Sequence, residues 1–356
     1  MMSSTLAASA YRPYDSVEAY VLGCTDEIWT ERGIGRIAST YYAPDVVVHG
    51  ALGSVRGIQP VLDGTTMSIS AYPDEVGRGE DVVWEPRGVD SFISSHRVFS
   101  TATNSGWTGY GPPTHRRIAK RALAHCLVRG GRIVEEWVVR DEYRLVVDLG
   151  LDPAEVAARL ARGRPWSPLD IGPLPASPLE SGVSGVRTPG PAEDDCARLV
   201  EMTETLWNAR MLHVLPRYVD RDVVLRTSRG RLLQGLREYS TETLDLLAPF
   251  SGAELRVVDV CAHDDHRKGR RVSLVWLLTG RYGGTERFGP GSGQRVEILG
   301  STQYVVADGR VVEEYRVYDE LALMIQIQQT NEERGTASAG APAAARAEAR
   351  GKDVTG

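Results

Sequence analysis

The sequence contains two copies of one 15-residue segment, and this repeat limits the fold more than any other feature. Residues 131–145 read GRIVEEWVVRDEYRL, residues 309–323 read GRVVEEYRVYDELAL, and nine of the 15 positions are identical. The same offset of 178 residues aligns Trp29 with Trp207. Solenoid repeats recur at intervals of roughly 20–50 residues. The longer interval in this chain of 356 residues therefore predicts a duplicated globular domain.

Composition divides the chain into two domains, a linker and a tail. Seven of the 19 prolines lie between Pro165 and Pro191, mixed with Gly and Ser, and such a segment cannot bury a core. The last residues are rich in Ala, Gly, Arg and Glu without a clear apolar stripe, which is typical of disorder. We expect a first domain, a linker, a divergent second domain and a disordered tail at residues 14–160, 161–192, 193–330 and 331–356.

Charge, hydropathy and cysteine spacing exclude several classes of protein. The chain has 41 Lys and Arg against 47 Asp and Glu, a net charge of −6, which disfavours binding to a nucleic-acid backbone. No apolar run reaches the roughly 18–20 residues of a membrane helix. The four cysteines form no CxxC pair, and the run from His263 to His266 is predicted to be a polar hairpin loop. We therefore expect a cytoplasmic protein with reduced thiols and no metal site.

Each copy has the same predicted order of elements. An amphipathic helical segment comes first, at residues 16–41 and 194–218, and a short strand follows it. A helix then starts at Gly57 or Gly235, and three or four strands end the unit. In the first copy these strands cover residues 81–85, 91–103, 117–128 and 133–143. Helices followed by strands predict an α+β fold of two tandem cone-shaped domains, each a curved, mostly antiparallel sheet wrapped around helices with an internal cavity.

The last strand of each copy carries a carboxylate on its more apolar face. Side chains alternate between the faces of a strand, so Asp141 shares a face with Trp137 and Val139, and Asp319 shares one with Tyr315. Burial among apolar groups raises the pKa of a carboxyl group and suits it to general acid/base catalysis. A salt bridge or hydrogen bond that supports the structure is the alternative. The alternation of side chains along the strand does not distinguish the catalytic role from the structural one.

The segments around Asp141 resemble a known family. Residues 109–114 read GYGPPT and residues 131–137 read GRIVEEW, and Asp141 and the sequence DLG at 148–150 follow them. These segments are similar to those of the SnoaL-like polyketide cyclases, which belong to the nuclear-transport-factor-like superfamily of α+β cones.

This resemblance covers about residues 16–150 and, more weakly, residues 194–328. In the family, the Asp of the motif is the acid/base residue of an intramolecular aldol ring closure that needs no metal or cofactor. The resemblance therefore implies that Asp141, and by the repeat Asp319, has this catalytic role.

Histidines and aromatic residues complete the predicted site. His49 and His125 could stabilise an enolate oxygen or move a proton. They align with Arg226 and Gln303, so only the first copy has them. His96 is a third candidate for the cavity wall, and a core or surface role is the alternative for all three. The predicted substrate-binding residues are aromatic side chains together with His96: Trp137, Tyr42, Trp107 and Tyr315.

Three functions fit these residues. The leading hypothesis is a cofactor-independent acid/base enzyme that cyclises, isomerises or dehydrates a small, largely apolar carbonyl compound. The second is a non-catalytic ligand-binding or assembly protein of the same fold, and the third is an epoxide-opening hydrolase. The duplication also predicts an intramolecular pseudo-dimer packed through its sheets, because related single domains pair in this way. Further homo-oligomers stay open.

Overall fold

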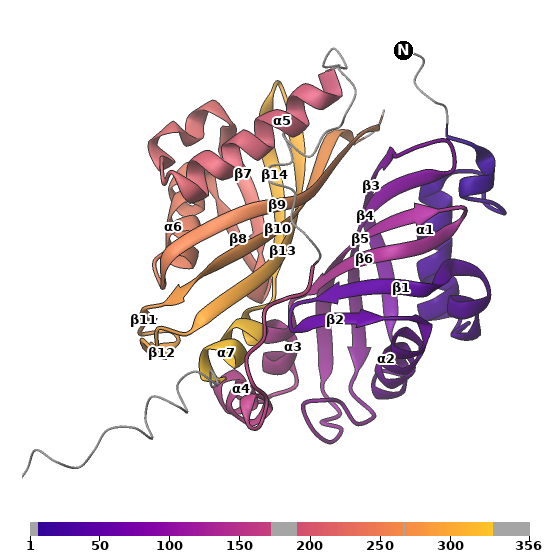
Figure 1. Cartoon of the computed structure of the whole chain (residues 1–356), viewed down its shortest axis with the longest axis horizontal. Helices are drawn as coiled ribbons and strands as arrows, with labels where there is room; N and C mark the ends of the chain where they lie inside the picture. Colours follow the sequence, from indigo (N-terminus) through magenta and orange to yellow (C-terminus); the bar gives the residue numbers. More distant parts are fainter. Residues whose placement is uncertain (1–5, 172–190, 266–267, 330–356) are drawn as a thin grey trace, which may run out of the picture.

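The computed structural model describes residues 6–171, 191–265 and 268–329. Two domains lie side by side, and each contains one six-stranded mixed sheet with helices packed on it (Figure 1). The predicted α+β fold with two tandem domains is confirmed. The predicted tail and residues 172–190 of the predicted linker lie outside the described residues. No described helix combines the length and the apolar character that crossing a membrane requires.

The first domain has the strand order β2-β1-β6-β5-β4-β3, in which β1 and β6 run parallel and the other neighbours antiparallel. Its strands are β1 (Tyr42–Gly50), β2 (Gly53–Arg56), β3 (Val76–Pro86), β4 (Ser91–Thr103), β5 (Arg117–Arg129) and β6 (Arg132–Arg140). Its helices and helical turns are η1 (Ala8–Ala10), α1 (Val17–Thr25), η2 (Asp26–Thr30), η3 (Ile37–Tyr41), α2 (Ile58–Ala71), α3 (Glu142–Asp148) and α4 (Pro153–Ala161).

Local sequence explains where the first helices begin. The Ser16 hydroxyl accepts a hydrogen bond from the Ala19 N–H at 3.1 Å and so caps α1. Gly57 precedes α2 with a φ of 84°, a left-handed backbone that glycine adopts without strain. Side chains of β6 alternate between the two faces of the sheet, and α1 ends in the η2 turn. These two features determine which side chains lie between the sheet and the helices.

The second domain repeats this arrangement with the order β8-β7-β14-β13-β10-β9. Its strands are β7 (Val219–Thr227), β8 (Arg231–Gln234), β9 (Phe250–Asp265), β10 (Gly269–Tyr282), β13 (Arg295–Ala307) and β14 (Arg310–Tyr318), and a separate small ribbon consists of β11 (Gly284–Thr285) and β12 (Gly289–Pro290). Its helices and helical turns are α5 (Pro191–Thr203), η4 (Glu204–Asn208), η5 (Leu212–Arg217), η6 (Ser228–Gly230), α6 (Gly235–Leu247) and α7 (Glu320–Gln328).

Strand register shows the duplication residue by residue. In the first sheet, His125 on β5 pairs with Trp137 on β6. In the second sheet, Gln303 on β13 pairs with Tyr315 on β14. Both residues of the second pair lie 178 positions after those of the first, so the offset found in the sequence is the structural alignment of the two sheets.

The two sheets face each other, with α1 and α2 outside one and α5 and α6 outside the other (Figure 1). Apolar side chains from both domains form one buried cluster between them: Val83, Ile93, Leu123, Trp137, Val139, Cys261, Val275, Leu299 and Val317. Gln303 donates from Nε2 to the Ser95 carbonyl oxygen at 3.0 Å, and Arg97 donates to Gln303 Oε1 at 2.7 Å. The sheets therefore pack as the pseudo-dimer prediction requires.

Candidate functional site

A cavity of about 900 Å³ lies inside the first domain. Strands β4, β5 and β6 form one wall, and α1, η2 and α2 form the opposite one. Helix α7 of the second domain also reaches the cavity through Asp319, Leu321 and Ile325. The site therefore belongs to the first domain but is completed by the second.

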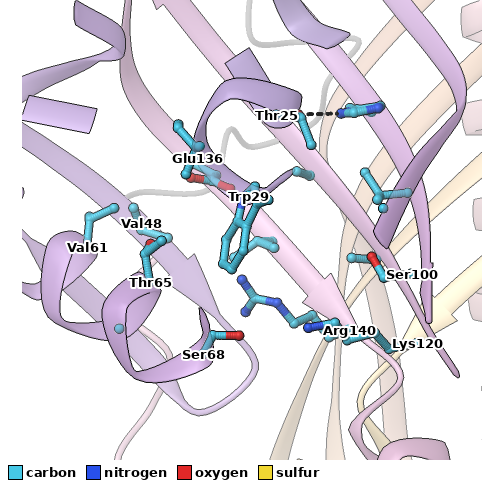
Figure 2. Close-up of a pocket in the computed structure, with 18 of the residues that line it drawn as sticks. Thr25, Trp29, Val48, Val61, Thr65, Ser68, Ser100, Lys120, Glu136 and Arg140 are labelled. Carbon is cyan, nitrogen blue, oxygen red and sulfur yellow. Dashed lines mark hydrogen bonds between the residues drawn. The ribbon is translucent and has the colours of Figure 1, made fainter. Parts of the chain in front are cut away.

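Small side chains leave this space open. Ala122 and Ala124 on β5 and Val138 on β6 line the sheet side of the cavity. On the helix side, Thr65 and Ser68 of α2 face the sheet (Figure 2). Because none of these side chains is long enough to cross the gap, the domain encloses room for a ligand.

Glu136 places a buried carboxyl group on the cavity wall. The residue lies on β6 and is 8% exposed. The Tyr42 hydroxyl donates a hydrogen bond to Glu136 Oε2 at 3.0 Å, whereas Oε1 has no hydrogen-bond partner among the described residues. Burial raises the pKa of Glu136, and the Arg140 charge and the Tyr42 hydrogen bond oppose part of that rise. Once ionised, such a carboxylate is a stronger base than an exposed one.

His96 lies at the same wall, on β4. Its Nδ1 is 3.1 Å from Thr25 Oγ1, the contact drawn as a dashed line in Figure 2. The Thr25 hydroxyl donates to the Val21 carbonyl oxygen at 3.0 Å, so Nδ1 is the protonated nitrogen that donates to Thr25. Nε2 is then an acceptor without a partner among the described residues. Burial lowers the pKa of His96 to about 4, so the ring is neutral at pH 7.

Two cations point into the cavity, Lys120 from β5 and Arg140 from the end of β6 (Figure 2). Lys120 Nζ pairs with Glu75 at 2.8 Å and lies 5.0 Å from the centre of the Tyr72 ring. Arg140 is exposed and forms no ion pair with any described residue. Trp29 projects from η2 into the space between the sheet and α2 (Figure 2).

Acidic and aromatic residues line the cavity where it meets α7. The Tyr110 hydroxyl donates to Glu142 Oε2 at 2.8 Å. Asp319 caps α7 by accepting a hydrogen bond from the Ala322 N–H at 3.1 Å, and burial and the Glu142 charge raise its pKa well above the usual range. Trp107, also at the cavity, is 72% exposed.

Asp141 follows the last residue of β6, beyond the strand face that carries Trp137 and Val139, and does not line the cavity. The strand expected over residues 133–143 therefore ends at Arg140, and Asp141 is the N-cap of α3 instead. Asp141 caps α3 by accepting hydrogen bonds from the N–H groups of Arg144 and, across the domain boundary, Gly230, both at 3.2 Å. Burial raises its pKa to about 6, and these N–H groups oppose part of the rise. The strand face of Trp137 and Val139 is apolar because it packs against the second sheet. An acid/base role for Asp141 stays a prediction from the family resemblance.

His49 and His125 lie on the wrong face for the cavity for the same reason. His125 Nε2 is 3.1 Å from Asp259 Oδ2 of the second domain, and the His125 side chain is fully buried. The His49 ring stacks on Trp137 with ring centres 5.3 Å apart, and its Nε2 is 3.0 Å from Glu135 Oε1. Neither imidazole lines the cavity.

Trp137 and Tyr315, both predicted to bind substrate, belong to the contact between the domains instead. Trp137 is part of the apolar cluster between the sheets. The Arg97 guanidinium of the first domain lies 3.4 Å from the centre of the Tyr315 ring, a cation–π contact. An aromatic side chain on an apolar strand face packs equally well against a ligand or a second sheet, and here the sheet occupies that face.

The structure brings four of the predicted site residues to the cavity: Tyr42, His96, Trp107 and Asp319. Sequence analysis missed Glu136 and Arg140, which share the other face of β6. Their signal was present, because two charged residues four positions apart on one face of a strand are unusual unless that face meets water or a ligand. The alternation of odd- and even-numbered residues separates the two faces of a strand but does not say which face lines the cavity.

Large side chains fill the corresponding space in the second domain. Val98 of the cavity wall corresponds to Trp276, whose ring lies against Gly300, where a Cβ atom would come within 2.1 Å of it. A buried Arg316 replaces the valine of β6 and pairs with Glu314, with Nε 2.7 Å from Oε1. These residues belong to or border a continuous core rather than a ligand site.

A family model described as SnoaL-like polyketide cyclase matches residues 19–149 and 197–327. The two matches together span more than half of the chain. The chain belongs to the SnoaL-like polyketide cyclase family. The resemblance seen in the motifs is thereby confirmed for both copies of this SnoaL-like protein.

Solved structures resemble parts of this SnoaL-like chain. A protein from Jannaschia sp. CCS1 named as a SnoaL-like polyketide cyclase is 22% identical with a TM-score of 0.36, and the match covers 40% of this chain and 99% of that one. A protein from Acidithiobacillus ferrooxidans named as a polyketide cyclase is 20% identical with a TM-score of 0.34, covering 40% and 98%. IdmH from Streptomyces antibioticus is 17% identical with a TM-score of 0.32, covering 36% and 96%. A comparison with curated proteins finds no match.

Proposed function

We propose that the first domain is a cofactor-independent acid/base enzyme acting on a polyketide-like carbonyl compound, with Glu136 as the residue that moves the proton. The observation that carries this proposal is a buried carboxyl group on the wall of a cavity of about 900 Å³. That volume is within the range of small-molecule sites, about 300–1,000 Å³. Membership of the SnoaL-like polyketide cyclase family supports cyclase-like chemistry.

In the proposed reaction, ionised Glu136 removes a proton from the carbon next to a carbonyl group and leaves an enolate. Attack of the enolate carbon on a second carbonyl closes a ring, and the protonated Glu136 returns its proton to the alkoxide oxygen that forms. Where no second carbonyl is in reach, return of the proton to another carbon of the enolate system gives an isomer. Tyr42 holds Glu136 Oε2 by its hydrogen bond, which leaves Oε1 for the substrate. Neutral His96 adds an uncharged polar side chain to the cavity wall.

The filled interior of the second domain favours a different role for that half. Trp276 and the buried Arg316 occupy the space that a ligand would need. The second domain instead covers the outer face of the first sheet and supplies α7 to the cavity. We assign it a structural role, which is the assembly hypothesis applied to one half of the chain.

Deuterium exchange tests the assignment of Glu136. The full chain is incubated in D2O with 2-tetralone, a neutral bicyclic ketone, and loss of the protons next to the carbonyl is followed by NMR. We expect the wild-type protein to accelerate exchange and Glu136→Gln to reduce it to the buffer rate. Glu135→Gln is the matched control, because Glu135 is the neighbouring carboxylate on the opposite strand face, beside His49.

Two results would contradict the proposal. One is exchange at the wild-type rate in Glu136→Gln. The other is loss of exchange in Glu135→Gln while Glu136→Gln stays active. Thermal unfolding of both variants shows whether any loss comes from misfolding, since glutamine can still accept the Tyr42 hydrogen bond.

A further inference from the structure

Three cationic side chains line the cavity: Lys120, Arg121 and Arg140. Arg121 forms an ion pair with Glu80 at 3.0 Å. Lys120 is neutralised by Glu75 at 2.8 Å, and His96 is neutral because burial lowers its pKa to about 4. Glu136 shares a strand face with Arg140 but forms no ion pair with it. Arg140 therefore presents a guanidinium group to the cavity without an ion-pair partner among the described residues.

An unpaired guanidinium restricts what can occupy the cavity. Arginine keeps its charge at any physiological pH, so a neutral apolar ligand that displaced water from Arg140 would leave a desolvated cation without compensation. A carboxylate removes this cost because it accepts two parallel hydrogen bonds from the guanidinium fork. We propose that the substrate of this cavity carries a carboxylate that binds Arg140. This inference rests on the proposed function of the same cavity.

The surrounding residues indicate the rest of the substrate. Glu136 and Arg140 lie on one face of β6, with Cα atoms about 13 Å apart at 3.3 Å per residue. Val138 lies between them, and Ala124 on β5 is paired with it. Trp29 offers an aromatic surface on the helix side. A flat apolar body with a carboxylate at one end and a carbonyl toward the other matches this order, which describes an aromatic or polycyclic keto acid.

The second domain provides an internal comparison. Its residue at the position of Arg140 is Tyr318, which is 1% exposed and part of the filled core. The domain that lost the space for a ligand thus also lacks the cation. Arginine occurs at this position only in the domain that has a cavity. We expect this distribution if Arg140 serves ligand binding rather than folding.

Calorimetric titration with 2-naphthoate and its methyl ester, near pH 7.5 and at low salt, tests the inference. The two probes share one aromatic body and differ in charge. We expect the wild-type full chain to bind the acid at least about tenfold more tightly, the factor that one charge-assisted hydrogen bond gives. Arg140→Met should abolish the preference and Arg140→Lys should keep part of it. Arg78→Met is the matched control, because Arg78 is exposed on β3 and does not line the cavity.

Several outcomes overturn the inference: equal binding of acid and ester by the wild-type protein, binding of neither, or a preference that survives Arg140→Met. The result is separable from the test of Glu136, because it measures affinity rather than proton exchange. Glu136→Gln should keep the preference for the acid. If proton exchange fails while the protein still prefers 2-naphthoate to its ester, only the catalytic assignment of Glu136 is wrong. If exchange succeeds and the protein shows no preference for the acid, only the inferred carboxylate of the substrate is wrong.

Discussion

Asp141→Asn tests how ionisation of a buried carboxyl group affects stability, because Asp141 is a buried cap of α3. Burial raises the pKa of Asp141 to about 6 from a usual 3.8, and this difference corresponds to about 3 kcal/mol by which ionisation destabilises the native state. The carboxyl group binds its proton more tightly in the folded chain than in the unfolded one. Its contribution to stability is therefore complete below about pH 4 and is lost as the pH rises through 6. Asparagine stays neutral and still caps the helix.

Urea unfolding of wild type and Asp141→Asn at pH 4, 5.5 and 7.5, followed by tryptophan fluorescence, measures this effect. We expect the variant to be more stable at pH 7.5 by up to about 3 kcal/mol, with the difference fading toward pH 4. Asp141→Ala, which removes the cap, should be about 1 kcal/mol less stable than Asp141→Asn. A variant less stable than wild type at pH 7.5, or a difference independent of pH, would refute the reasoning. Exchange of 2-tetralone protons in the same variant shows whether the resemblance-based role of Asp141 holds.

Two further substitutions test the interface and the cavity. Gln303→Ala removes the buried acceptor of Arg97 between the domains, so we expect a loss of about 2–4 kcal/mol in the free energy of unfolding by urea; an unchanged midpoint would mean that this contact is dispensable. The double variant Val98→Trp, Ala122→Gly copies the Trp276–Gly300 pair into the cavity wall, with the glycine leaving room for the ring. It should abolish calorimetric binding of 2-naphthoate while the protein stays folded. Val89→Trp, at a position 59% exposed and away from the cavity, should bind as wild type does; binding by the double variant would contradict the assigned location.

The repeat was sufficient to derive much of the fold. Identical residues at a constant offset report common ancestry of two units, and the order of amphipathic and alternating segments reports helices before strands. The pairing of His125 with Trp137 and of Gln303 with Tyr315 reproduces that offset in three dimensions. These properties depend on local or periodic patterns, so the sequence alone is sufficient to predict them.

Which face of β6 lines the ligand site was decided only by the tertiary structure. Alternation placed Asp141 and Trp137 on one face and Glu136 and Arg140 on the other, but both a cavity and a partner sheet favour apolar side chains. The second domain covers the first face, so its apolar character reports the interface between sheets. The filled core around Trp276 likewise depends on side-chain volumes brought together from separate elements. Packing against residues distant in the sequence, which no local pattern encodes, separates the cavity from the interface in this protein.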